Sequence, residues 1–364
     1  MKQYKDNFFI EAENKKEIAK KNIDFFYILS NEYKKNNRKL FAYTLYKRAE
    51  RIKNCLNHWE SDLYKKNGLL TVKKVYRCKD MFCPNCRTQN VGKAIFKFYP
   101  ITEKMKICGY NPYLMTLTVP NVELVNLSDE IKIMNKAFKQ LWRWLYKPFY
   151  KNGSYYGGYK ERMFDCIGAV KALEVTVQKS NSNFFHVHFH VIVFLDKVND
   201  DLFFKDIPGG YQYRTESYIY YSQADVLLQK LWKMAYDAKT INEFGNASDD
   251  WHDNYICDIR ELKMPYGIFE VFKYCFKDID IKNLEIFKYM FFGLKGKRQR
   301  QGYGRLYNIK IDDKDLNDDE NSADDISNYL EYKDEIPVAI NNNLKEMTEK
   351  YGGYKKISIY KKIS

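Results

Sequence analysis

The apolar residues of the chain follow two periods, one typical of helices and one typical of strands. Helical spacing is clearest after Ser128, which we expect to cap a helix with Asp129 and Glu130 in its first turn. The apolar positions of this helix are Ile131, Met134, Phe138, Leu141 and Leu145. Pro148 stops the pattern, since proline cannot continue a helix.

A period of two marks residues 168–178 and 184–195, and the polar sequence KSNSN between them predicts a β-hairpin. Shorter strands are expected over 113–119 and 255–262. Further helices are expected over 9–65, 222–238 and 268–278, and a basic strand or loop over 295–305. Hairpins mixed irregularly with helices favour an α+β fold, in which helices flank a central antiparallel sheet.

The second strand of the hairpin holds three of the five histidines of the chain, in the sequence FHVHFHV. Side chains alternate along a strand, so His186, His188 and His190 share one face. Val187, Phe189 and Val191 take the other face and bury it in the core. One histidine in such a place would be an ordinary core residue, but three in alternation indicate metal ligands.

The hairpin also predicts an acidic neighbour for these histidines. If the five-residue loop is centred on Asn181, paired positions sum to 362, and Glu174 lies opposite His188. A shift of one residue would turn Glu174 to the wrong face. Imidazole and carboxylate ligands together suit Mn²⁺ or Mg²⁺, and zinc remains an alternative.

A cysteine cluster predicts a second metal site. Cys78, Cys83 and Cys86 lie in YRCKDMFCPNCRTQN, and the CPNC knuckle is typical of structural zinc. A closed site needs a fourth ligand, for which Cys55 is the first candidate and His58 the second. Buried reduced cysteines are the alternative explanation, and the more scattered cysteines of the chain fit it better.

A candidate nucleophile lies in the sequence PYGIFEVFKYCFKDID. Glu270 and Tyr274 are four residues apart and share a helical face, with Lys277 close to the next turn. A metal and Lys277 would favour the phenolate of Tyr274, which can attack phosphorus, while Glu270 could take a proton from water. On spacing alone, an ordinary amphipathic helix with a surface tyrosine is the commoner explanation.

Composition and charge point to a polyanionic partner. The net charge is +14; residues 311–364 carry 8 Lys and 13 Asp or Glu, so residues 1–310 hold +19. Aromatic residues make up 17% of the chain, and basic and aromatic side chains together suit nucleic acid. The N-terminus has no signal-peptide pattern and no apolar run is long enough to span a membrane, so we expect a cytoplasmic protein with reduced cysteines.

Several segments in order resemble the replication initiators of small rolling-circle plasmids of Gram-positive bacteria, in the single-tyrosine group of the HUH endonuclease superfamily. They span about residues 50–308 and are Cys55, CKDMFCPNC, LMTLTVPN, ALEVTVQ with HVHFHVIVF, ADVLLQKLWKMA with DIRELK, EVFKYCFKD and LKGKRQRQGYGRL.

The resemblance implies a site-specific single-strand DNA endonuclease and strand transferase. His188 and His190 would be the metal ligands, with His186 as the extra histidine. Tyr274 would nick one strand at the double-strand origin and keep the 5′ phosphate, and Glu270 would activate water for the terminating cleavage. The partners implied are origin DNA and the host helicase and polymerase.

These expectations divide the chain into four parts. They are a helical segment (1–50), a cysteine-rich zinc-binding subdomain (51–105), an HUH-like catalytic domain (106–310), and an acidic linker with a Lys-rich tail (311–364). Two other functions compete. A transposase or relaxase would use the same chemistry, and a non-enzymatic zinc-dependent DNA-binding regulator would leave the three histidines without a role.

Overall fold

The computed structural model describes residues 2–55, 58–64, 69–75, 77–146, 149–151, 154–156, 165–178, 181–196, 198–212, 217–246, 255–262, 281, 283–307 and 356–361. The chain forms two compact units. Unit 1 comprises residues 1–96 and 310–364, and unit 2 comprises residues 97–309. None of the described helices is both long and apolar enough to span a membrane.

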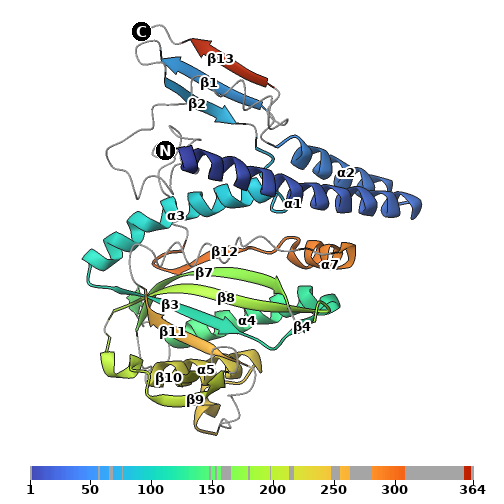
Figure 1. The fold of residues 1–364 in the computed structure, drawn as a ribbon. Helices are drawn as coiled ribbons and strands as arrows, with labels where there is room; N and C mark the ends of the chain where they lie inside the picture. The colour runs from blue at the N-terminus through green and yellow to red at the C-terminus, as the bar shows by residue number, and fades with distance from the viewer. Residues whose placement is uncertain are drawn as a thin grey trace. The chain divides into compact units, whose positions relative to one another are not determined.

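Unit 2 is built on one antiparallel sheet (Figure 1). Its strands are β3 (Asn111–Thr118), β4 (Val122–Glu123), β7 (Cys166–Val177), β8 (Phe184–Leu195), β11 (Cys257–Glu261) and β12 (Arg300–Gly304). The order across the sheet is β11-β3-β8-β7-β12, and β4 pairs with the start of β8. The expected α+β class, an antiparallel sheet flanked by helices, is confirmed.

The helices of unit 2 are α4 (Leu127–Leu145), α5 (Gln223–Tyr236) and α7 (Leu284–Leu294). Short 3-10 turns cover Leu124–Asn126, Asp200–Phe203 and Ile241–Asn246, and two small hairpins pair β5 (Phe149–Lys151) with β6 (Ser154–Tyr156) and β9 (Ile207–Gln212) with β10 (Ser217–Tyr221). Phe189 of β8 meets Phe138 of α4 and Trp232 of α5, with ring centroids 5.8 and 6.3 Å apart. The two helices therefore cover the apolar face of the sheet.

Ser222 caps α5, at the first residue of the helix expected over 222–238. Its hydroxyl accepts a hydrogen bond from the Asp225 N–H at 3.1 Å, and the Asp225 carboxylate accepts from the Ser222 N–H at 2.8 Å. The same carboxylate accepts from the Ile259 N–H of β11 at 2.8 Å. One buried side chain thus caps the helix and fixes it to the sheet edge.

The predicted cap of α4 is wrong. The helix begins at Leu127, with Asn126 in the cap position and Ser128 inside the first turn. Leu124 and Leu127 are both buried, so their apolar contacts extend the helical segment upstream of Ser128. The end is as expected, because α4 stops at Leu145 shortly before Pro148.

Unit 1 contains α1 (Lys2–Lys35), α2 (Lys39–Lys53) and the start of α3 (Pro84–Ile107). Its sheet joins β1 (His58–Tyr64), β2 (Leu69–Val75) and β13 (Lys356–Lys361) in the order β13-β1-β2. β13 pairs with β1 in parallel, although it lies in the segment expected to be a tail. The acidic run from Asp312 to Asp325 lies outside the described residues.

One charged residue is buried in the apolar layer of unit 2. Lys171 of β7 is 2% exposed, and its amine lies 4.0, 4.9 and 5.8 Å from the ring centroids of Phe189, Phe138 and Tyr303. It also donates a hydrogen bond to the Asn135 side chain. Burial lowers the pKa of Lys171 to about 7.

We predict that Lys171→Met stabilises the protein near neutral pH by about 1–2 kcal/mol. Because the folded pKa of about 7 lies below that of an unfolded lysine, the unfolded state binds more protons between about pH 7 and pH 10. Stability of the parent protein should therefore rise with pH in this window, and the variant should lose that rise. Denaturant unfolding at pH 7 and pH 9, with exposed Lys136→Met as control, measures both effects; a destabilised variant at pH 7 contradicts the prediction.

Candidate functional site

The three histidines of β8 lie on the face of the sheet opposite to α4 and α5. Val187, Phe189 and Val191 are completely buried on the helix side. The rings of His186 and His188 stack with centroids 5.9 Å apart, and those of His188 and His190 are 6.3 Å apart. β8 lies inside the sheet, so its neighbours on both sides hold the row of imidazoles in place.

Glu174 lies beside the histidines in the register that the sequence predicts. It is the pairing partner of His188 across the β7–β8 hairpin. Its carboxylate, however, reaches diagonally to His190, where Oε2 and Nε2 are 2.6 Å apart. Both side chains are almost fully buried. Pairing fixes the backbone positions and leaves the choice of hydrogen-bond partner to the side-chain rotamer.

Strand β3 supplies the other flank of the row. Thr118 pairs with His188 and Thr116 with His190, so both threonines share the histidine face. The Thr118 hydroxyl lies 3.2 Å from His188 Nδ1, within hydrogen-bonding distance. This contact fixes the plane of the ring and leaves Nε2 available to a ligand.

Burial keeps the rings of His186 and His188 neutral. It lowers the pKa of His188 to about 4, against the attraction of Glu174, and it also lowers the pKa of His186. At neutral pH both rings therefore carry a free lone pair, the form in which imidazole binds a metal. The donor types fit a divalent cation, although the Glu174–His190 hydrogen bond uses one atom of each partner.

Two charged residues on the same face were missed by the sequence reasoning. The register places Asp258 of β11 beside Thr116, and Arg300 of β12 beside Ala172, in the row that contains His190. Asp258 accepts a hydrogen bond from Lys205 at 2.6 Å. The alternation of charged and apolar residues in DIRELK was a signal for this position, but the pairing of β11 with β3 could not be read from it.

Glu270, Tyr274 and Lys277 lie outside the described residues. Their roles stay predictions that come from the spacing and from the family resemblance.

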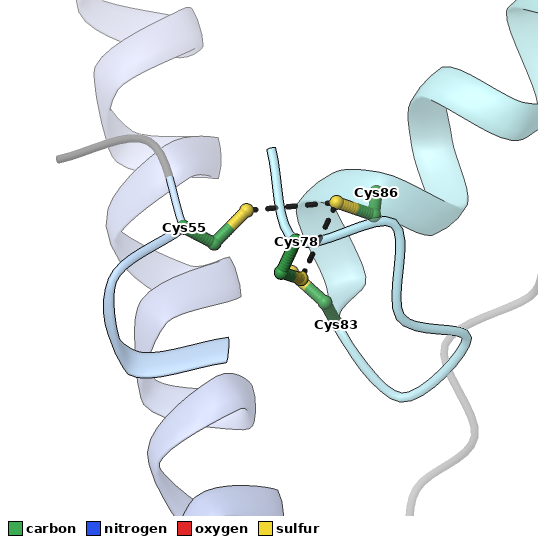
Figure 2. A group of neighbouring side chains, drawn as sticks. All are labelled: Cys55, Cys78, Cys83 and Cys86. Carbon is green, nitrogen blue, oxygen red and sulfur yellow. Dashed lines mark hydrogen bonds between the residues drawn. The ribbon is translucent and has the colours of Figure 1, made fainter. Parts of the chain in front are cut away.

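The cysteine cluster forms a closed group in unit 1. The sulfurs of Cys55, Cys78, Cys83 and Cys86 all lie within 4.8 Å of one another, and no other such group of ligand atoms occurs among the described residues. Cys55 follows α2, Cys78 and Cys83 lie in the loop before α3, and Cys86 lies in its first turn (Figure 2). The four sulfurs point toward one another, as ligands of one tetrahedral ion do.

The loop of the cluster is arranged around its sulfurs and around one buried acid. The Lys79 N–H donates to Cys86 Sγ at 3.2 Å, and hydrogen bonds from the neighbouring thiols and this amide lower the pKa of Cys86. Asp80 is 4% exposed; it accepts from the Phe82 N–H at 2.9 Å and from both Nε and Nη2 of Arg48. Because Arg48 belongs to α2, this ion pair joins the helix to the loop.

We predict that Cys55→Ser reduces the metal retained by the purified protein to well below one ion per chain. A hydroxyl is a much weaker zinc ligand than a thiolate, so the site would be left with three strong donors. Metal content after dialysis, measured by mass spectrometry of the dissolved ions, checks this. His58→Asn is the matched control and should retain a full complement; the reverse pattern would identify His58 as the fourth ligand.

Known proteins match most of the length of the chain. A family described as "Replication protein" matches residues 69–352. A "Protein rep" from Bacillus amyloliquefaciens is 24% identical over 325 residues, which cover 85% of each chain. Another "Protein rep", from Lentilactobacillus hilgardii, is 24% identical over 84% of this chain and 85% of its own length. One from Staphylococcus aureus is 27% identical over 58% of this chain and 75% of its own length.

No solved structure matches the chain significantly. The family match covers the cysteine loop, the histidine strand and the segment of the candidate tyrosine, all within 69–352. The chain therefore belongs to this family of plasmid replication (Rep) proteins.

Proposed function

We propose that the protein initiates rolling-circle replication of a plasmid by nicking one DNA strand at the double-strand origin. The observation that carries the proposal is the row of His186, His188 and His190, with Glu174 beside it, on the face of the sheet not covered by α4 and α5. In a replication protein, aligned imidazoles with a carboxylate suit the handling of a phosphodiester. The sheet with these ligands is also consistent with an HUH-like fold.

The histidine face would hold a Mn²⁺ or Mg²⁺ ion through His188 and His190, with His186 and Glu174 as further ligands. Such an ion supplies Lewis-acid polarisation of a scissile phosphate. Thr118 would keep the His188 ring in the orientation that presents Nε2, and the buried apolar face behind β8 would keep the row rigid.

Tyr274 would be the nucleophile. Its phenolate oxygen attacks the phosphorus, the bond from phosphorus to the 3′ oxygen breaks, and that oxygen takes a proton to become a free 3′-OH primer. The 5′ phosphate stays on the tyrosine as a covalent ester. Lys277 favours the phenolate by its charge, and Glu270 takes the proton of the water that attacks in the terminating cleavage.

The cysteine group would hold a structural Zn²⁺. Four buried sulfurs within one coordination sphere leave no open position for a substrate, which is typical of structural zinc. The ion would keep the end of α2 and the start of α3 together, since Cys55 follows the first helix and Cys86 belongs to the second.

The nucleophile is tested with a single-stranded oligonucleotide that carries the nick site and a fluorescent label at its 3′ end. With Mn²⁺, the label should become covalently attached to the protein, and peptide mapping should find it on Tyr274. Tyr274→Phe should abolish attachment while DNA binding stays intact, and exposed Tyr218→Phe serves as control. Normal nicking by Tyr274→Phe would remove Tyr274 from the mechanism, and a protein that binds but never nicks would be a regulator instead.

Glu270 is tested separately because it acts in a later step. We expect Glu270→Gln to form the covalent complex at about the normal rate and to fail in the terminating cleavage, since amide nitrogen and oxygen cannot take a proton from water at neutral pH. Time courses of covalent complex and released product on a two-site oligonucleotide distinguish the steps. Normal release by the variant contradicts the assigned role.

A further inference from the structure

Helix α2 of unit 1 has one buried face and one exposed face. Its buried positions are Ala42, Leu45, Ala49 and Ile52. The opposite side exposes a stripe at spacings of three and four residues, which we call the α2 stripe: Leu40, Tyr43, Thr44, Lys47, Arg51 and Asn54. Leu40 is 83% and Tyr43 56% exposed, so even the less polar members of the stripe lie in solvent.

The charge around the α2 stripe is strongly one-sided. Residues 34–53 contain eight Lys or Arg and a single acid, Glu50. Glu50 accepts a hydrogen bond from Tyr27 of α1 and is only partly exposed, so the stripe itself has no acidic group. Lys47 lies 5.4 Å from the Tyr43 ring centroid, and the stripe therefore combines cations, an aromatic ring, a hydroxyl and an amide.

Helix α2 is also held by contacts on two sides. Ser30 of α1 donates a hydrogen bond to the Ala42 carbonyl at 2.7 Å. On the other side, the Arg48 guanidinium binds Asp80 through two nitrogens and lies 5.2 and 5.5 Å from the ring centroids of Phe26 and Phe82. Arg51 lies 3.7 Å from the same carboxylate, so the cysteine loop also contacts the C-terminal part of the stripe.

We propose that the α2 stripe is a binding surface for duplex DNA. This proposal rests on the proposed function in replication initiation. Lys47 and Arg51 neutralise phosphates, and the Tyr43 hydroxyl contacts sugar or base edges. Thr44 and Asn54 donate to the Leu40 and Glu50 carbonyls, and their side-chain oxygens face outward as acceptors. A rigid helix with one outward polar row fits the major groove of a duplex. The cysteine cluster then has a role in DNA recognition, because it holds the helix in its place.

The test uses the full-length chain and a 30-base-pair duplex of mixed sequence, with affinity measured by fluorescence anisotropy over a series of salt concentrations. Lys47→Gln combined with Arg51→Gln should weaken binding roughly tenfold near 0.1 M salt and reduce the slope of log affinity against log salt by about 2. Lys20→Gln combined with Lys21→Gln removes the same charge from exposed positions of α1 and should change neither quantity appreciably.

Two further measurements separate this surface from the nicking site and from folding. Both double variants should keep the parental metal content and should nick the single-stranded oligonucleotide at the parental rate. Equal loss of duplex binding in the two double variants, or no loss in Lys47→Gln/Arg51→Gln, would overturn the proposal. If the parent protein fails to nick yet the α2 variant alone loses duplex binding, the surface stands and the proposed nicking function is wrong.

Discussion

The pairing of β7 with β8 is the constraint on which the rest of unit 2 depends. In this register Glu174 lies opposite His188. The register decides which residues of the two twelve-residue strands face the helices and which face away. Completely buried Val187, Phe189 and Val191 make any other register costly, because a shift of one residue would bury three imidazoles and expose the apolar side chains. The hydrophobic core therefore positions the polar face.

The cysteine cluster and the histidine row differ in how closely their ligand atoms approach one another. The cysteine sulfurs converge within 4.8 Å and are buried, so a bound ion would be enclosed on all sides. The histidines lie in a row with ring centroids about 6 Å apart, and their carboxylate neighbour is hydrogen-bonded to one of them. If each group held the ion proposed for it, the row would leave room for a substrate, whereas the closed cysteine site would not.

The sequence was informative where a local period decided the structure. The hairpin register, the capping of α5 by Ser222 and the grouping of three cysteines all follow from spacings of a few residues. It failed where distant contacts decide. The start of α4 depends on the burial of Leu124 and Leu127. The parallel pairing of β13 with β1 joins segments about 300 residues apart, and no local sequence pattern predicts it. The hydrogen bond from Glu174 to His190 was not predicted either, because it depends on a side-chain rotamer and not on the strand register.

The pairing of β13 with β1 affects the order in which unit 1 can be completed during synthesis. Unit 2 is inserted, in sequence, between two segments that belong to unit 1. A ribosome must release all of residues 97–309 before it releases Lys356–Lys361, so the sheet of unit 1 gains its last strand only after the whole of unit 2 has been synthesised. On a growing chain, every strand of the histidine face is thus synthesised while the sheet of the other unit still lacks the partner of β1.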